Sequence, residues 1–436
     1  MDPGDPKTLF AAMYQRQRTG FGFNGGGPGS GIYRTLDGGT TWTELTNGLP
    51  EGDKGRIGLD IYRQDGNMVF AVIEADKRDP TRGFSFGGSQ GPRKSGVFQS
   101  LDRGDTWEKM SNTNPRPMYY SQIRIDPSNP DRIYVLGTQL AVSDDAGRTF
   151  RNDGATQIHV DHHAMWIDPN DPDHLILGSD GGVSGSFDGS KTWREYDNLA
   201  IGQFYQINVD MRDPYYVCGG LQDNSSWCAP HNTRSIYGIR NNDWYDVSGG
   251  DGFFNVIDPT DPMIMYSESQ GGNMSRVDVT TGEGMRMRPV ARPLPGMEDA
   301  DEDRTYRFNW STPIVISEHD PATLYTGANV LLKTLDRGVT WQEVSPDLTK
   351  QIDRKELEIM GVMGSEPMLS PNDGISTYGN ITAIGESPLN AGLLYVGTDD
   401  GNLQQTRDGG TTWTDLTSNI RDLPERTYVS RVVASR

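Results

Sequence analysis

The densest group of side chains able to do chemistry in this 436-residue chain lies in the pentapeptide His159 to His163, which reads HVDHH. Imidazole and carboxylate groups are ligands that Zn²⁺ accepts. Alternate side chains of a strand share one face, so we predict that His159, Asp161 and His163 face one side and His162 the other. His159, Asp161 and His163 could therefore hold a metal ion together. The alternative is that these residues only hydrogen-bond the backbone and neighbouring carboxylates.

Acidic residues at the ends of predicted strands are the other candidates for chemistry. Glycoside hydrolysis needs two carboxyl groups, one of them kept protonated, at about 5 Å or about 6.5 to 9.5 Å from each other. The sequence offers five catalytic candidates without assigning a pair: Asp161, Asp180, Asp223, Asp251 and Asp399. The alternative is that acidic loops only solvate the surface of a chain with 60 acidic residues.

Polar and aromatic residues in the same predicted loops are candidates for ligand binding, since polar groups often converge at a pocket mouth. They are Gln222, Asn224, Trp227, Gln270, Asp400 and Asn402. No cofactor is required by this set. The only inorganic group predicted is a metal ion. It is either Zn²⁺ on the histidine cluster or Ca²⁺ on loop carboxylates such as Asp180 and Asp399, although the spacing of these carboxylates is not that of a compact calcium loop.

A repeated octapeptide shows which elements position these residues. It begins as TLDGGTTW and returns five times with small changes, at 35–42, 100–107, 143–150, 186–193, 334–341 and 406–413. Asp can fold its carboxylate onto turn amides, Gly adopts positive φ, and the aromatic residue begins the returning strand. We therefore predict that each copy is a hairpin turn with a structural role.

A second phrase, Asp-Pro followed by a β-rich run, precedes most of these turns, so that one unit reads as about four short antiparallel strands. Asp102, Asp145 and Asp188 are separated by 43 residues each, a period typical of propeller blades. We predict an all-β propeller with about eight visible blades, forming one domain over 1–436. The blades are expected at 1–47, 51–112, 113–153, 155–199, 201–248, 250–292, 309–348 and 378–419.

The last residues, 427–436, read TYVSRVVASR and are predicted to form an innermost strand. That strand either completes the first blade and closes the ring, or continues into blades that this chain does not contain. Truncation is favoured because the chain opens on an Asp-Pro turn and its first residues, MDPGDPKTLFAAM, do not read as a signal peptide.

Composition excludes several classes of protein. The net charge of −20, without a basic stripe, argues against a nucleic-acid partner. No apolar run approaches the roughly 20 residues of a membrane-spanning helix, so no transmembrane segment is expected. Cys218 and Cys228 are the only cysteines. They form either one bridge or two free thiols, and the free thiols are slightly favoured.

The octapeptide is similar to the Asp-box, or bacterial neuraminidase repeat, of sialidases, xyloglucan-cleaving glycosidases and the sortilin receptor. The whole chain resembles bacterial sortilin-like or Asp-box glycosyl hydrolase proteins. Besides the boxes, the likeness is carried by FNGGGPGSGIY (Phe23 to Tyr33), HVDHHAMWIDP (His159 to Pro169), GGLQDNSSW (Gly219 to Trp227) and YVGTDDGNL (Tyr395 to Leu403). The fourth box departs from the pattern, because Ser190 stands where Gly is expected.

The resemblance implies a secreted or periplasmic propeller, with the boxes on one face and function on the other. It implies an acidic polar channel face that binds a peptide, protein or glycan. The alternative is a glycoside hydrolase with an Asp acid/base pair, so enzymatic activity stays open. A sialidase is disfavoured, because the Arg-Ile-Pro motif of that family is absent.

Overall fold

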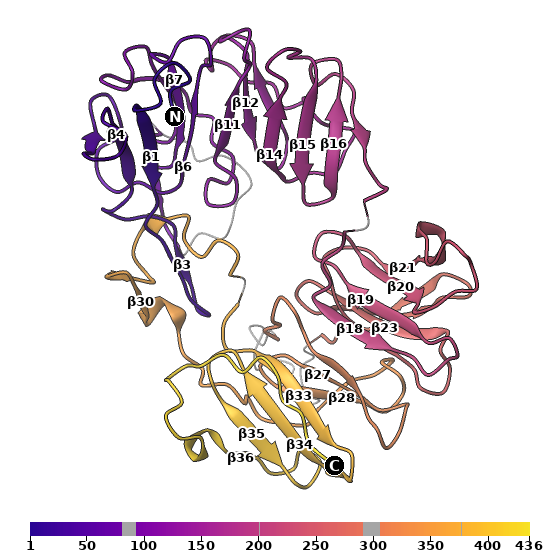
Figure 1. Cartoon of the computed structure of the whole chain (residues 1–436). Coiled ribbons are helices and arrows are strands. Elements are labelled where there is room, and N and C mark those ends of the chain that lie inside the picture. Colours follow the sequence, from indigo (N-terminus) through magenta and orange to yellow (C-terminus); the bar gives the residue numbers. More distant parts are fainter. Residues whose placement is uncertain (81–92, 200, 291–305, 376) are drawn as a thin grey trace. The chain divides into compact units, whose positions relative to one another are not determined.

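The computed structural model describes residues 1–80, 93–199, 201–290, 306–375 and 377–436 (Figure 1). These residues form short β-strands joined by turns, with three 3₁₀ turns, at Asn241–Asp243, Arg354–Glu356 and Thr417–Asn419, and no α-helix. The all-β prediction is confirmed. No helix among the described residues is long and apolar enough to cross a membrane.

The chain divides into two compact units. The first unit comprises Met1–Ala200 and Lys355–Gly374, and the second comprises Ile201–Arg354 and Ile375–Arg436. The prediction of a single propeller domain over the whole chain stays a prediction.

Four sheets of the first unit fall inside the first four predicted blades, and all their strand pairs are antiparallel. In order of sequence they are β1 (Leu9–Met13), β4 (Gly31–Thr35) and β5 (Thr43–Leu45); β6 (Ile57–Ile61), β7 (Val69–Ile73), β9 (Gly96–Ser100) and β10 (Glu108–Ser111); β11 (Gln122–Ile125), β12 (Ile133–Leu136) and β13 (Ala141–Ser143); and β14 (His162–Ile167), β15 (Leu175–Ser179), β16 (Gly182–Ser186) and β17 (Arg194–Glu195).

Three short strand pairs complete the first unit: β2 (Gln17–Arg18) with β3 (Phe23–Asn24), β8 (Lys77–Arg78) with β32 (Met368–Leu369), and β30 (Glu358–Ile359) with β31 (Val362–Met363). The pair of β8 with β32 ties the late segment Lys355–Gly374 to the early part of the chain.

The second unit contains four four-stranded antiparallel sheets, one in each of the last four predicted blades. They are β18 (Gln206–Val209), β19 (Tyr216–Gly220), β20 (Ser226–Pro230) and β21 (Tyr245–Ser248); β22 (Gly252–Ile257), β23 (Ile264–Ser269), β24 (Asn273–Asp278) and β25 (Glu283–Arg286); β26 (Ile314–Ile316), β27 (Leu324–Gly327), β28 (Leu331–Thr334) and β29 (Gln342–Glu343); and β33 (Ile381–Ser387), β34 (Asn390–Thr398), β35 (Leu403–Thr406) and β36 (Thr414–Asp415).

Consecutive sheets within each unit pack face to face. In the first unit, Phe70 and Val72 of one sheet share a buried apolar cluster with Ile123 and Ile133 of the next. In the second unit, Tyr266 shares such a cluster with residues of β26 and β27. Burial of these alternating apolar residues drives the stacking of the sheets, which is the arrangement expected of neighbouring blades.

Each octapeptide forms the same hydrogen-bonded turn, which we call the octapeptide turn. In the first copy, Thr35 Oγ1 donates to Asp37 Oδ1 at 2.7 Å and accepts from Gly39 N at 2.9 Å. Thr41 donates from its peptide N to Asp37 Oδ1 at 2.9 Å and from its hydroxyl to Oδ2 at 2.7 Å. The other five copies repeat these four bonds. The predicted structural role is confirmed.

These bonds stabilise the ionised form of the turn aspartates. Donation by the threonine four residues later lowers the pKa of Asp145 to about 2, and the pKa values of Asp188, Asp336 and Asp408 also fall to about 2. The turns therefore keep their bonds until the pH falls well below the usual range for aspartate.

Ser190 occupies the fifth position of the fourth octapeptide turn with φ of 72°, where the other copies have glycine. A residue with a Cβ atom is strained in this region. We expect Ser190→Gly to raise the free energy of unfolding by about 1 kcal/mol, as measured by urea denaturation. The matched control is Gly39→Ser in the first turn, where φ is 99°; it should lower the stability by a similar amount. Equal stability of Ser190→Gly and wild type would contradict this account.

Cys218 and Cys228 form a disulfide, so the favoured expectation of two free thiols is wrong. They are direct register partners in β19 and β20, and both are buried. Opposed residues of antiparallel strands place their side chains on the same face and close together. The register of two strands decided the pairing, and the spacing of the two cysteines did not reveal it.

The residues 427–436 form no regular strand, contrary to the prediction. Val429 instead donates its peptide N to Thr398 O at 3.0 Å, and its carbonyl accepts from Thr382 Oγ1 at 2.7 Å. A side chain at Gly397 of β34 would collide with Val429. This segment is therefore held by close packing over a glycine, and not by the hydrogen-bond ladder of a strand. Ring closure and continuation into further blades both stay predictions.

Candidate functional site

The histidine cluster lies at a β-bulge where β14 begins. His162 pairs with Ser179 and Ala164 with Gly178, so His163 is an extra residue in the register. Asp161, just before the strand, has φ of 65°. The predicted alternation assumed a regular strand from residue 159, and it is wrong because the backbone turns at residue 161 and bulges at residue 163. His162 is fully buried as a result, whereas His163 is 35% exposed.

Two of the predicted aspartates meet beside this bulge. His163 Nε2 lies 3.0 Å from Asp180 Oδ1, and Tyr119 Oη donates to Asp180 Oδ2 at 3.2 Å. Tyr120 donates its hydroxyl to Asp161 Oδ1. One carboxylate oxygen of Asp161 and one of Asp180 lie within 4.8 Å of each other. The sequence named both aspartates without pairing them, and the fold of the first unit pairs them.

Aromatic rings border this carboxylate pair. The ring of His163 lies 4.9 Å from that of Tyr119 and 5.2 Å from that of Tyr120, between ring centroids. The guanidinium of Arg116 covers the Tyr119 ring at 4.2 Å and pairs with Asp373 at 2.8 Å. Burial, together with the hydrogen bond to Asp161, raises the pKa of Tyr120, so its hydroxyl keeps its proton. We call Tyr119, Tyr120, Asp161, His163 and Asp180 the carboxylate–aromatic site.

The predicted zinc ligands are not gathered. Among the described residues, the ligand atoms of His159, Asp161 and His163 do not all lie within 4.8 Å of one another. The peptide N of His159 donates to Glu195 Oε1 at 3.2 Å, and its ring Nδ1 lies 3.0 Å from Val160 O. A bound Zn²⁺ or Ca²⁺ ion stays a prediction.

Asp223 and Asp251 belong to hydrogen-bonded turns of the second unit. Asp223 N donates to Asp251 Oδ1 at 2.9 Å, and Asp251 N donates to Gln270 Oε1 at 2.9 Å. The predicted ligand-binding residues nearby also bond within one turn, since Asn224 Nδ2 donates to Gln222 O and Trp227 Nε1 donates to Asn224 O. These groups hold successive loops together.

Asp399, Asp400 and Asn402 are almost wholly buried in the turn after β34. Asp399 accepts from Asn380 N and Nδ2 at 2.7 and 2.8 Å, and its burial raises its pKa to about 6. Thr398 Oγ1 donates to Asp400 Oδ1 and accepts from Asn402 N, as in the first half of an octapeptide turn. Hydrogen bonds to neighbouring residues of the protein therefore already occupy these polar groups.

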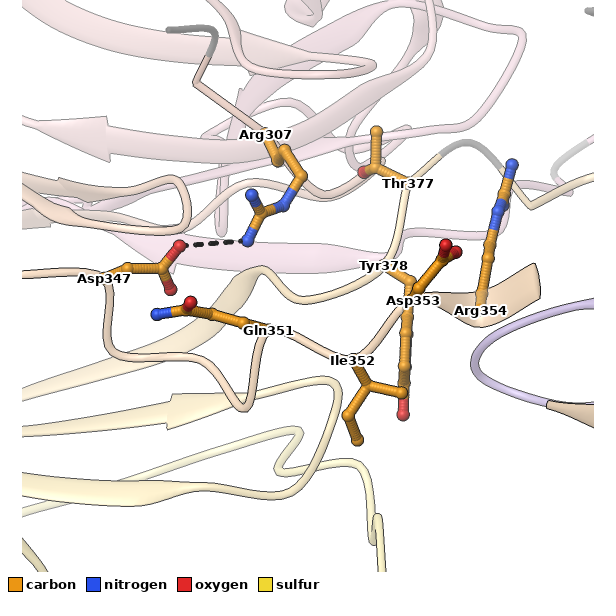
Figure 2. A pocket seen from close by; sticks show the side chains of 8 residues that line it. All are labelled: Arg307, Asp347, Gln351, Ile352, Asp353, Arg354, Thr377 and Tyr378. Carbon is orange, nitrogen blue, oxygen red and sulfur yellow. Dashed lines mark hydrogen bonds and ion pairs between the residues drawn. The ribbon is translucent and has the colours of Figure 1, made fainter. Parts of the chain in front are cut away.

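A cavity of about 410 Å³ in the second unit was not predicted (Figure 2). Arg307 and Asp347 line one part of it, Gln351, Asp353 and Arg354 another, and Thr377 and Tyr378 complete it. Most of these residues lie in the link between the seventh and eighth predicted blades. The one signal for it was the length of that link, residues 349–377, which is longer than the turns elsewhere.

No protein-family model matches the chain, and no curated protein matches it. Among solved structures it is similar to the GH74 xyloglucanase from Xanthomonas campestris, with 14% identity and a TM-score of 0.32, over 94% of this chain and 66% of that one. It is also similar to the GH74 enzyme of Niastella koreensis, with 13% identity and a TM-score of 0.30, over 97% of this chain and 68% of that one. A third similar structure is YCF48 bound to a D1 peptide, with 11% identity and a TM-score of 0.29, over 76% of this chain and 97% of that one.

The chain thus spans about two thirds of the length of the xyloglucanase. The strand order and the stacking of antiparallel sheets within each unit show that the chain is an all-β protein with sheets of the β-propeller type.

Proposed function

We propose that the protein is an extracytoplasmic, sortilin-like Asp-box propeller that binds a glycan at the carboxylate–aromatic site. The observation that carries the proposal is the approach of Asp161 and Asp180 within 4.8 Å, each held by a tyrosine hydroxyl. The Cys218–Cys228 disulfide supports an extracytoplasmic setting, because disulfides persist in oxidising compartments.

Sugar rings offer neighbouring hydroxyl donors on their edges and C–H groups on their faces. Two adjacent carboxylates accept such donors, since each oxygen has two lone pairs. The partly exposed rings of Tyr119 and His163 add an apolar surface with a polar edge. His163 is 35% exposed and the Asp180 side chain 17%, so a ligand can reach both.

The test is binding to a panel of polysaccharides by affinity electrophoresis. Wild type should be retarded by at least one member, and Asp180→Asn should weaken that binding about tenfold or more, because the amide turns one acceptor oxygen into a donor. Asp131→Asn, an exposed aspartate of the same unit, is the matched control and should bind as wild type does. Binding of peptides or proteins and of no polysaccharide would sink the glycan proposal.

A second candidate is a retaining glycoside hydrolase. It is favoured by the closeness of Asp161 and Asp180, since an upper bound of 4.8 Å between one oxygen of each is nearer to the roughly 5 to 5.5 Å of retaining enzymes than to the roughly 6.5 to 9.5 Å of inverting ones. Reducing ends should then appear with wild type, and Asp161→Asn and Asp180→Asn should each lower the rate at least about 100-fold. Binding without any cleavage by wild type would leave the binding protein as the function.

A further inference from the structure

The cavity of the second unit is lined by two arginines, in a chain whose net charge is −20. Its volume of about 410 Å³ falls in the range of small-molecule sites, roughly 300 to 1,000 Å³. In Figure 2, Arg307 meets Asp347 at one end, and Arg354 stands beside Asp353 at the other. Nothing in the proposed glycan function uses this place.

Arg307 is held in one orientation by three bonds. Its Nε donates to Gly379 O at 3.2 Å, and its Nη2 donates to Asp347 Oδ2 at 3.2 Å and to Thr349 Oγ1 at 3.3 Å. No partner for Nη1 is found in the described part of the chain. A guanidinium fixed in this way loses little side-chain entropy when a further group binds to it.

Asp347 is already fully engaged as an acceptor. Thr349 donates to its Oδ1 from the peptide N at 3.0 Å and from the hydroxyl at 2.6 Å, and Asn329 Nδ2 donates to Oδ2 at 3.0 Å. Burial alone would raise its pKa, but these hydrogen bonds and Arg307 lower it. Asp347 therefore serves to orient Arg307, and it leaves the Nη1 group of that arginine for a ligand.

The remaining lining groups suit a ligand with hydroxyls. Thr377 Oγ1 donates to Phe308 O at 2.7 Å, so its own oxygen can still accept. Gln351 offers both a donor and an acceptor. The Tyr378 ring and Ile352 add the apolar surface that a ring-shaped molecule needs.

We propose that this cavity binds a hydroxylated carboxylate with the size and chemistry of a uronic acid. Arg307 binds the carboxylate through its Nη1 group, because a guanidinium matches the geometry of a carboxylate. Arg354, at the other end of the cavity, joins the polar lining that binds the hydroxyls. The site lies wholly on residues of the second unit and does not depend on the glycan site of the first unit.

The experiment is calorimetric titration of the whole protein with D-glucuronate, its methyl ester and D-glucose. Glucuronate should bind at least tenfold more tightly than either neutral sugar. Arg354→Gln and Arg307→Gln should each weaken glucuronate binding at least tenfold. Arg286→Gln, which removes an exposed arginine of β25 outside the cavity, should bind as wild type does.

Arg354 lies in a short surface turn, so Arg354→Gln tests the site even if Arg307→Gln fails to fold. Glucose or the ester binding as tightly as glucuronate would overturn the proposal. So would equal affinity in wild type and Arg354→Gln, or no heat of binding with any of the three compounds at 10 millimolar, a concentration of about the weakest useful affinity.

Discussion

Glu74→Gln is expected to stabilise the first unit at pH 8 by about 3 kcal/mol relative to wild type, and to leave its stability almost unchanged at pH 4.5. Glu74 follows β7 and is 1% exposed. Burial raises its pKa from 4.5 to about 7, against an opposing hydrogen bond from Ser370. Each pKa unit is worth about 1.4 kcal/mol, which gives the expected difference. Glutamine can still accept the bond that Ser370 Oγ donates to Oε1 at 2.5 Å.

The sign follows from proton binding. The folded state holds the Glu74 proton more tightly than the unfolded state, so the stabilisation is complete below pH 4.5 and is lost as the pH rises to about 7. Urea denaturation of both proteins at several pH values and constant ionic strength measures the difference. Parallel curves for Glu74→Gln and wild type across this window would show that the carboxyl does not titrate as expected.

The gain in stability from His162→Phe is expected to have the opposite pH dependence and to grow as the pH falls. His162 is fully buried, and neither ring nitrogen has a hydrogen-bond partner among the described residues. Burial lowers its pKa from 6.5 to about 4, although the Asp161 charge opposes the shift. The wild type therefore loses about 3 kcal/mol as the pH falls from 6.5 to about 4, because the unfolded chain takes up the proton first. Phenylalanine has no such proton, so the variant should gain that amount on wild type at pH 4.

Each of these variants is the control for the other. Glu74 costs stability as the pH rises from 4.5, and His162 costs stability as it falls from 6.5, so in wild type the two slopes nearly cancel. Glu74→Gln should expose the acid slope of His162, and His162→Phe should expose the alkaline slope of Glu74. The double variant should differ from wild type by a nearly constant amount. A single variant whose unfolding free energy keeps the wild-type pH dependence would contradict the account of that residue.

The octapeptides and the Asp-Pro phrases predicted the sheets well, because their information is local. A turn such as 35–42 needs only its own hydroxyls, aspartate and glycine to specify its side-chain bonds. Each predicted blade accordingly contains one antiparallel sheet of three or four strands.

The candidate site was predicted only in part, because its geometry depends on departures from regular structure. Asp161, His163 and Asp180 were all named, but the bulge at His163 changed which groups meet. The register of β19 with β20, which joined the cysteines, is a property of two strands together. The cavity at Arg307 is built from a link that has no repeat to follow.

The four shared side-chain bonds of the octapeptide turn join residues no more than four positions apart. Closing such short loops costs little chain entropy, so a turn can form during folding before the strands beside it have found their other partners. We expect the six turns to act as local nuclei, each bringing two strands of its own sheet together. Because these side-chain bonds lie within the octapeptide, they also survive gene duplication intact. One sequence phrase can then be copied along a chain while the loops at the opposite ends of the sheets diverge.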